Sequence, residues 1–243
     1  MTDVPFFAMD TLNQLIPLIA VLALPMLFAI TVHEAAHGWV ASRRGDKTAL
    51  MLGRVTFNPL KHIDPVGTIA VPLGIFLLAS LMGSAPILFG WAKPVPVNWR
   101  NLQRPRLDMA LVAVAGPTAN LLMALAWGLM IKLGALLLTT YQGPTAEWLA
   151  MPLIYMGAAG VLINLLLMVL NLFPLLPLDG GRVLNAALPP RLSRYYSRLE
   201  PFGLMILILM LFTGALTLVL FPAVSAVLSV MPGAGIVREL FPL

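Results

Sequence analysis

Two histidines and a glutamate lie within the five-residue run His33-Glu34-Ala35-Ala36-His37. On an α-helix, residues four positions apart share a face, so His33 and His37 can direct both imidazoles at one metal ion. Neutral imidazole is a common zinc ligand, and zinc lowers the pKa of a bound water toward about 7. Glu34 can accept the proton of that water and return it to the leaving amine. The pattern predicts a zinc hydrolase site with Glu34 as general base.

The composition places this pattern in a membrane protein. Hydrophobic residues make up 60% of the 243 residues and charged residues 10%, whereas soluble globular chains carry about 25% charged residues. So few charges could not cover a water-soluble fold of this size. Two His and one Glu on an apolar helix are costly unless they are paired or bound to a ligand, which favours a metal site over a chance pattern. The chain has no cysteine, which excludes disulfides and Cys-based zinc sites.

Apolar runs divide the chain and predict about five to six transmembrane segments. The runs are about 12–40, 66–91, 107–140, 151–173 and 202–230. We therefore expect an all-α, multi-pass membrane protein, a helical bundle that forms a single domain over residues 1–243. Short extended or re-entrant elements are expected around the site. Segment 50–57 is β-prone and is a candidate for strand formation, and the alternating prolines of 93–97 exclude a helix interior.

Basic residues between the apolar runs predict the orientation. Thirteen of the 15 Lys and Arg residues lie in the segments 42–64, 92–106 and 182–198. The positive-inside rule places all three segments in the cytoplasm. Run 66–91 must then begin and end on one side, which favours a re-entrant hairpin; a spanning helix with a basic outer loop is the alternative. Counting about 1.5 Å per residue back from Arg43 places His37 and His33 within the hydrocarbon region, toward its cytoplasmic side.

A zinc hydrolase needs a third protein ligand and one open coordination position. Asp179 is the best candidate, because it follows the fourth apolar run in a segment that Pro174 and Pro177 break. On the predicted topology it lies at the depth of the two histidines, and the two glycines after it allow backbone conformations closed to other residues. The alternative is that Asp179 caps the next helix or pairs with Arg182. His62 is the competing ligand, although a histidine in a polar loop is usually solvated.

Three motifs together resemble the site-2 protease family of intramembrane zinc metalloproteases, peptidase family M50. They are His33-Glu34-Ala35-Ala36-His37, Ala115-Gly116-Pro117-Thr118-Ala119-Asn120, and the segment from Asn171 to Gly181 with its Leu178-Asp179-Gly180. Their order is that of the family, and a downstream Leu-Asp-Gly in a hydrophobic chain is specific to it. The resemblance implies one catalytic Zn²⁺ held by His33, His37 and Asp179, with Glu34 as the catalytic base. It also implies hydrolysis of peptide bonds in membrane-embedded proteins.

The same resemblance indicates further site residues. In the family the Gly-Pro-x-x-Asn motif lies near the active site, so we expect Asn120 to face the zinc cavity and bind substrate backbone. An interhelical hydrogen bond is the alternative for this residue. Asn171, in the third motif, is the second expected substrate-binding residue. With no room for a PDZ or CBS domain, the chain resembles the compact type.

The expected partners are a lipid bilayer and a membrane protein substrate with a transmembrane segment, and no nucleic acid. The expected location is the inner membrane of a prokaryotic cell, with the active site toward the cytoplasm. A zinc-binding membrane transporter is the alternative function, because intramembrane His and acidic residues can line an ion pathway. A transporter would need neither Glu34 nor an open coordination position.

Overall fold

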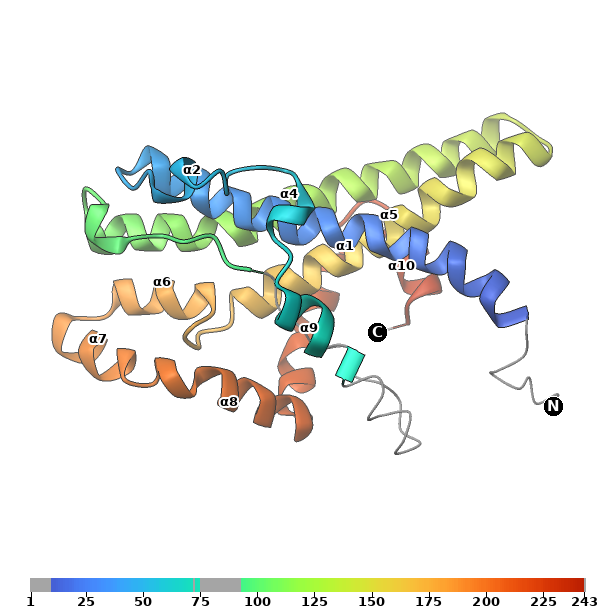
Figure 1. Cartoon of the computed structure of the whole chain (residues 1–243). Coiled ribbons are helices and arrows are strands. Elements are labelled where there is room, and N and C mark those ends of the chain that lie inside the picture. Colours follow the sequence, from blue (N-terminus) through green and yellow to red (C-terminus); the bar gives the residue numbers. More distant parts are fainter. Residues whose placement is uncertain (1–9, 72, 75–92, 243) are drawn as a thin grey trace. The chain divides into compact units, whose positions relative to one another are not determined.

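The computed structural model describes residues 10–71, 73–74 and 93–242 (Figure 1). Helices and irregular segments make up this described part of the chain, and no strand occurs within it. The all-α class predicted from the sequence is therefore confirmed. Most of run 66–91, and with it the choice between a re-entrant hairpin and a spanning helix, lies outside the described residues.

The helices follow the predicted apolar runs. The long ones are α1 (Asp10–Arg43), α4 (Pro105–Thr140) and α5 (Pro144–Asn171), and the last run is divided into α8 (Glu200–Phe212) and α9 (Ala215–Leu228). The shorter ones are α2 (Thr48–Met51), α6 (Asp179–Ala187), α7 (Pro190–Ser197) and α10 (Ala234–Leu240), with the helical turns η1 (Pro59–Lys61), η2 (Pro65–Ala70) and η3 (Trp99–Asn101). The break before α9 comes at Gly214, whose φ of 75° lies in the left-handed region that glycine adopts without steric cost.

Three of the described helices are long and apolar enough to cross a membrane. They are the Val21–Arg43 part of α1, and the whole of α4 and α5. α7 and α8 are bent by 62° and make a fourth span if they are counted together. α9 has 14 residues, fewer than the roughly 20 that the hydrocarbon core requires of a perpendicular helix. The chain is an integral membrane protein, and its HEAAH run lies inside a candidate span.

Segment 50–57 does not form a strand, so that expectation is wrong. Residues 48–51 form α2, and the chain then turns at Gly53, whose φ is 62°. A β-prone sequence needs a neighbouring strand to pair with, and the described residues offer none. Residues 93–98, by contrast, are outside any helix, as the prolines predicted.

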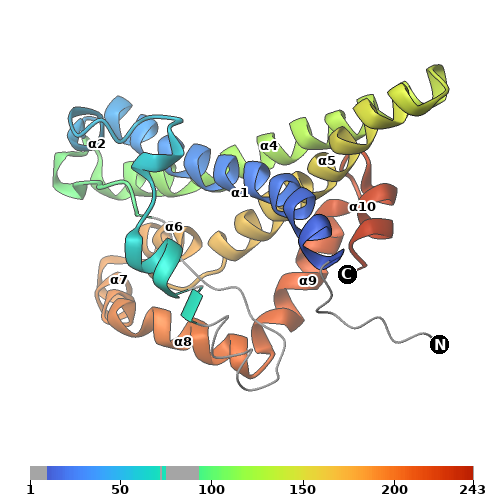
Figure 2. The same cartoon turned by 45° about the vertical axis from the view of Figure 1, so that its right-hand side comes forward.

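The chain divides into two compact units. Unit 1 comprises Met1–Ala29, Asn120–Leu170 and Leu207–Leu243, and unit 2 comprises Ile30–Ala119 and Asn171–Ile206. In unit 1, the later part of α4 and α5 run antiparallel, side by side (Figures 1 and 2). The core of this unit includes the fully buried Ile131, Val161 and Leu165. A single domain over the whole chain remains a prediction.

Unit 2 contains the end of α1, the beginning of α4 beside it, and the hairpin of α6 and α7 (Figure 2). A tight turn precedes α6. A Cβ added to Gly180 would overlap the carbonyl of Leu172, and one added to Gly181 would overlap the backbone of Leu175. Both glycines have helical backbone, so close packing, and not an unusual conformation, requires glycine here. This packing sets where α6 begins, and therefore where Asp179 lies.

Candidate active site

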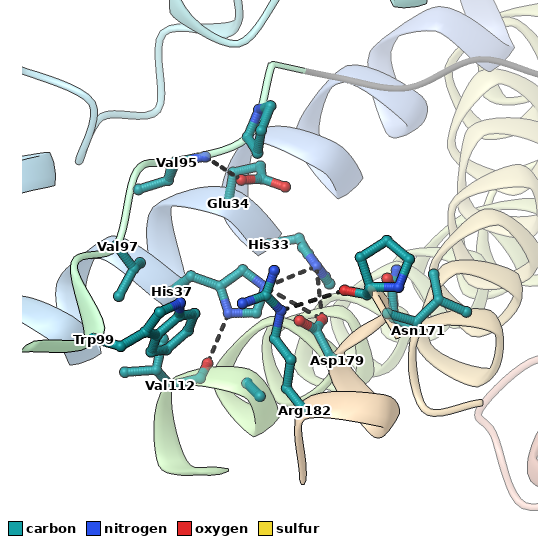
Figure 3. A pocket seen from close by; sticks show the side chains of 14 residues that line it. His33, Glu34, His37, Val95, Val97, Trp99, Val112, Asn171, Asp179 and Arg182 are labelled. Carbon is teal, nitrogen blue, oxygen red and sulfur yellow. Dashed lines mark hydrogen bonds and ion pairs between the residues drawn. The ribbon is translucent and has the colours of Figure 1, made fainter. Parts of the chain in front are cut away.

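His33, His37 and Asp179 form a buried group of possible metal ligands in unit 2. The Nε2 atoms of the two histidines are 3.0 Å apart, and Oδ2 of Asp179 is 3.3 Å from each (Figure 3). Ligands about 2.0–2.1 Å from a tetrahedral zinc ion are about 3.3–3.4 Å from one another. Asp179 Oδ2 is buried and has no hydrogen-bond partner among the described residues. A buried polar oxygen requires a partner, and a bound cation would be one. The three side chains therefore fit one zinc ion.

Helix α4 orients one of the histidines. Nδ1 of His37 donates a hydrogen bond of 2.7 Å to the carbonyl oxygen of Val112. With the proton on Nδ1, Nε2 keeps its lone pair, which is the tautomer that a metal ligand needs. The carbonyl acts here as the outer partner that commonly fixes the ring of a metal-binding histidine.

Gly116 allows α4 to approach both imidazoles. A Cβ at this position would lie 2.5 Å from Cε1 of His33 and 2.5 Å from Nε2 of His37. Any other residue would push the rings away from their present positions. The motif that begins at Ala115 thus contributes a glycine to the site, a role that sequence reasoning missed. A glycine inside a long apolar helix was the available signal, because it weakens the helix and usually has a packing reason.

Glu34 lies in the same cavity, and its carboxylate is turned toward segment 93–97 (Figure 3). Its Oε2 accepts a hydrogen bond of 2.7 Å from the backbone N–H of Val95. The segment is itself anchored, because Nη2 of Arg54 donates to the carbonyl of Lys93 at 2.8 Å. An ionised acceptor makes the bond to Val95 a strong one, so it restricts the orientation of Glu34.

Asp46 anchors the other end of this segment to the end of α1. Its fully buried carboxylate accepts a hydrogen bond of 2.7 Å from the backbone N–H of Asn98. The other oxygen accepts from Thr48 N at 3.1 Å and from Asn101 Nδ2 at 3.0 Å. Burial raises the pKa of Asp46, but the hydrogen bonds from these residues outweigh it and hold the pKa below its ordinary value.

A cavity of about 320 Å³ contains these groups. Its lining residues are His33, Glu34, His37, Pro94, Val95, Val97, Trp99, Val112, Ala113, Asn171, Pro177, Leu178, Asp179 and Arg182. All of them belong to unit 2. The volume is at the lower end of the range for small-molecule sites, roughly 300–1,000 Å³, and polar and apolar groups contribute about equally to the walls.

Asn171 and Asn120, the two substrate-binding residues predicted from the sequence, differ in whether they line the cavity. Asn171 is among the cavity-lining residues. Asn120 is fully buried in unit 1, and its Nδ2 donates to Oδ1 of Asn164 at 2.9 Å and to the carbonyl of Ala29 at 3.2 Å. These are the interhelical hydrogen bonds that the sequence left as its alternative. Substrate binding by either asparagine remains a prediction.

The alternatives for the third ligand have weaker support in the structure. The ion pairs found among the described residues include none between Asp179 and Arg182. Asp179 is the first residue of α6, and its side chain faces the two histidines. His62 is buried, with Nε2 3.1 Å from the carbonyl of Thr56, and does not belong to the ligand group.

Comparisons with known proteins agree on one family. The profile of Peptidase family M50 matches residues 130–214, a range that includes Asp179 but not the HEAAH run. YwhC of Bacillus subtilis (strain 168), provisionally named a zinc metalloprotease, is 36% identical over 208 residues, which are 84% of this chain and 86% of YwhC. Rip2 of Mycolicibacterium smegmatis, which has the same provisional description, is 28% identical over 190 residues, 78% of this chain and 66% of Rip2. No solved structure matches the chain significantly.

Proposed function

The chain belongs to peptidase family M50 and is a metalloprotease, and from this premise we propose that it is an intramembrane zinc metalloendopeptidase. It would hydrolyse peptide bonds of membrane-embedded protein substrates. The observation that carries this proposal is that two of the three possible metal ligands lie within a candidate membrane span. His33 and His37 lie within the candidate span Val21–Arg43, with Asp179 Oδ2 at 3.3 Å from both Nε2 atoms.

The chemistry follows from the residues around the cavity. His33, His37 and Asp179 would hold one zinc ion, which when bound polarises a carbonyl group and activates water near neutral pH. Glu34 takes a proton from the attacking water as the water oxygen bonds to the carbonyl carbon. The carbon–nitrogen bond then breaks, and Glu34 returns the proton to the amine nitrogen. The hydrogen bond from Val95 orients Glu34 for both transfers.

The proposed substrate is a membrane protein with a transmembrane segment, cleaved in the bilayer. A helix hides its peptide bonds in its own hydrogen-bond ladder, so the substrate must be unwound locally before it can enter the cavity. The proposed location is the inner membrane of a prokaryotic cell, with the site toward the cytoplasm. Its support is the clustering of basic residues in 42–64, 92–106 and 182–198.

The test compares the wild type with Glu34→Gln in lipid vesicles. The variant should keep one zinc ion per chain, measured by elemental mass spectrometry, and lose cleavage by about 100-fold or more. Membrane peptides that remain bound to the variant would then be identified by mass spectrometry as substrates. Glu147→Gln, an exposed glutamate in the first turn of α5, is the matched control and should cleave normally.

Two outcomes would count against the proposal. Cleavage by Glu34→Gln at the wild-type rate would show that Glu34 is not the base. Zinc flux into vesicles without any cleavage by the wild type would instead support the transporter alternative.

A further inference from the structure

Arg182 lies in the cavity beside the proposed catalytic residues and has no role in the chemistry described so far. It follows Asp179 by three residues on α6, and residues at this spacing share a helix face. Figure 3 shows its side chain rising from α6 toward His33, His37 and Asp179. Among the described residues that line the cavity, Arg182 alone is always positively charged. The cavity thus contains a cation next to the metal ligands.

Two contacts position the guanidinium group. Its Nε donates to the carbonyl of Pro177 at 3.3 Å, and its central carbon lies 4.9 Å from the centre of the Trp99 ring. Both neighbours also line the cavity. These contacts occupy Nε and one face of the planar group, and within the described chain no hydrogen bond or ion pair occupies Nη1 or Nη2. Two pairs of donors are therefore available to a ligand.

Peptide hydrolysis needs positive charge beside the carbonyl oxygen, because negative charge develops there in the transition state. A bound zinc ion would supply part of this charge, whereas the side chains of Glu34 and Asp179 carry the opposite charge and cannot add to it. Glu34 extends from α1 and is bound by Val95, whereas Arg182 extends from α6 and lies against Trp99. A base and a hydrogen-bonding cation thus enter the cavity from two different helices.

We propose that Arg182 binds the carbonyl oxygen of the scissile peptide bond and stabilises the negative charge that forms on it. As the water oxygen bonds to the carbonyl carbon, the π-electron pair moves to the carbonyl oxygen, which accepts hydrogen bonds from Arg182. The water proton passes to Glu34. The electron pair then returns to the carbon–oxygen bond, the carbon–nitrogen bond breaks, and the nitrogen takes the proton from Glu34, which leaves a carboxylic acid and an amine. The inference rests on the proposed function.

The test uses Arg182→Gln, Arg182→Lys and the control Arg194→Gln, which changes an exposed arginine of α7 outside the cavity. Calorimetry would measure the affinity of each zinc-loaded protein for two probes, N-phosphoryl-Leu-Ala-amide and N-acetyl-Leu-Ala-amide. The anionic probe resembles the charged transition state, and the neutral one resembles the ground state. Arg182→Gln should bind the anionic probe at least about 10-fold more weakly and the neutral probe unchanged. Arg182→Lys should fall between it and the wild type, because Lys keeps the charge without the planar fork.

Kinetics on substrates recovered with Glu34→Gln provides a second readout. Arg182→Gln should lower kcat by about 100- to 1,000-fold with little change in KM, since the interaction forms mainly in the transition state. Zinc content should equal that of the wild type. Arg194→Gln should match the wild type in every measurement.

Three results would overturn the inference: unchanged kcat in Arg182→Gln, equal loss of affinity for both probes, or loss of zinc from both Arg182 variants. The last would make Arg182 a structural residue. Failure of the proposed function is distinguishable, because it shows as absence of cleavage by the wild type. The two-probe comparison does not depend on turnover.

Discussion

Replacing Gly116 with alanine tests whether the glycine of α4 sets the positions of the metal ligands. The added Cβ would lie 2.5 Å from Cε1 of His33 and from Nε2 of His37, whereas ordinary contacts begin at 3.4 Å. The rings or α4 must therefore move by roughly 1 Å, and zinc ligands tolerate about 0.2 Å. Overpacking of this kind costs about 1–3 kcal/mol. If the whole of that cost reduces the free energy of zinc binding, zinc affinity drops by about 5- to 150-fold.

The assay is competition for zinc between the protein and a chelator of known affinity. Two alanine variants separate a local effect from general instability. Gly128→Ala, on the same helix but in unit 1, places a Cβ 2.5 Å from the carbonyl of Pro232; it should lower the melting temperature and leave zinc affinity unchanged. Gly235→Ala meets no atom within 4 Å and should alter neither. Wild-type zinc affinity in Gly116→Ala would refute the reasoning.

Three further changes probe the ligand group and its supports. Asp179→Ala removes the third ligand and should weaken zinc binding in the same competition assay by about 100-fold or more, whereas unchanged binding would exclude Asp179 as a ligand. Val95→Pro removes the N–H that binds Glu34. A hydrogen bond to a charged group contributes about 1.5–3 kcal/mol, so kcat should fall roughly 10- to 150-fold with full zinc content. A kcat equal to that of the wild type would show that this bond does not orient the base. Asp46→Asn should destabilise the protein at pH 7. The pKa of Asp46 is lowered in the folded state, so the ionised carboxylate stabilises the fold above the unfolded pKa of about 3.9, and this stabilisation is lost as pH falls through the folded pKa. Thermal unfolding from pH 7 to 3 should show the difference from the wild type shrinking, and a constant difference would contradict this.

Local features of the chain were predictable from the sequence. The spacing of His33 and His37 places them on one face of any helix, because the period of a helix does not depend on its surroundings. The apolar runs 12–40, 107–140, 151–173 and 202–230 became helices, since the bilayer leaves backbone groups no other partners. Asp179 was identifiable because proline and glycine interrupt an apolar chain around it. By contrast, the strand expected at 50–57 failed, since strand formation depends on a partner elsewhere.

The contacts that shape the site were decided by the tertiary structure. Val95 lies 61 residues from the Glu34 whose carboxylate it binds, and Gly116 is far along the chain from both imidazoles that it accommodates. No periodic pattern connects such residues, because their proximity follows from how α1, α4 and α6 pack. The sequence by itself determined which side chains could hold zinc and transfer protons. Packing decided which backbone groups orient them, and it brought Trp99 against Arg182 in the same cavity.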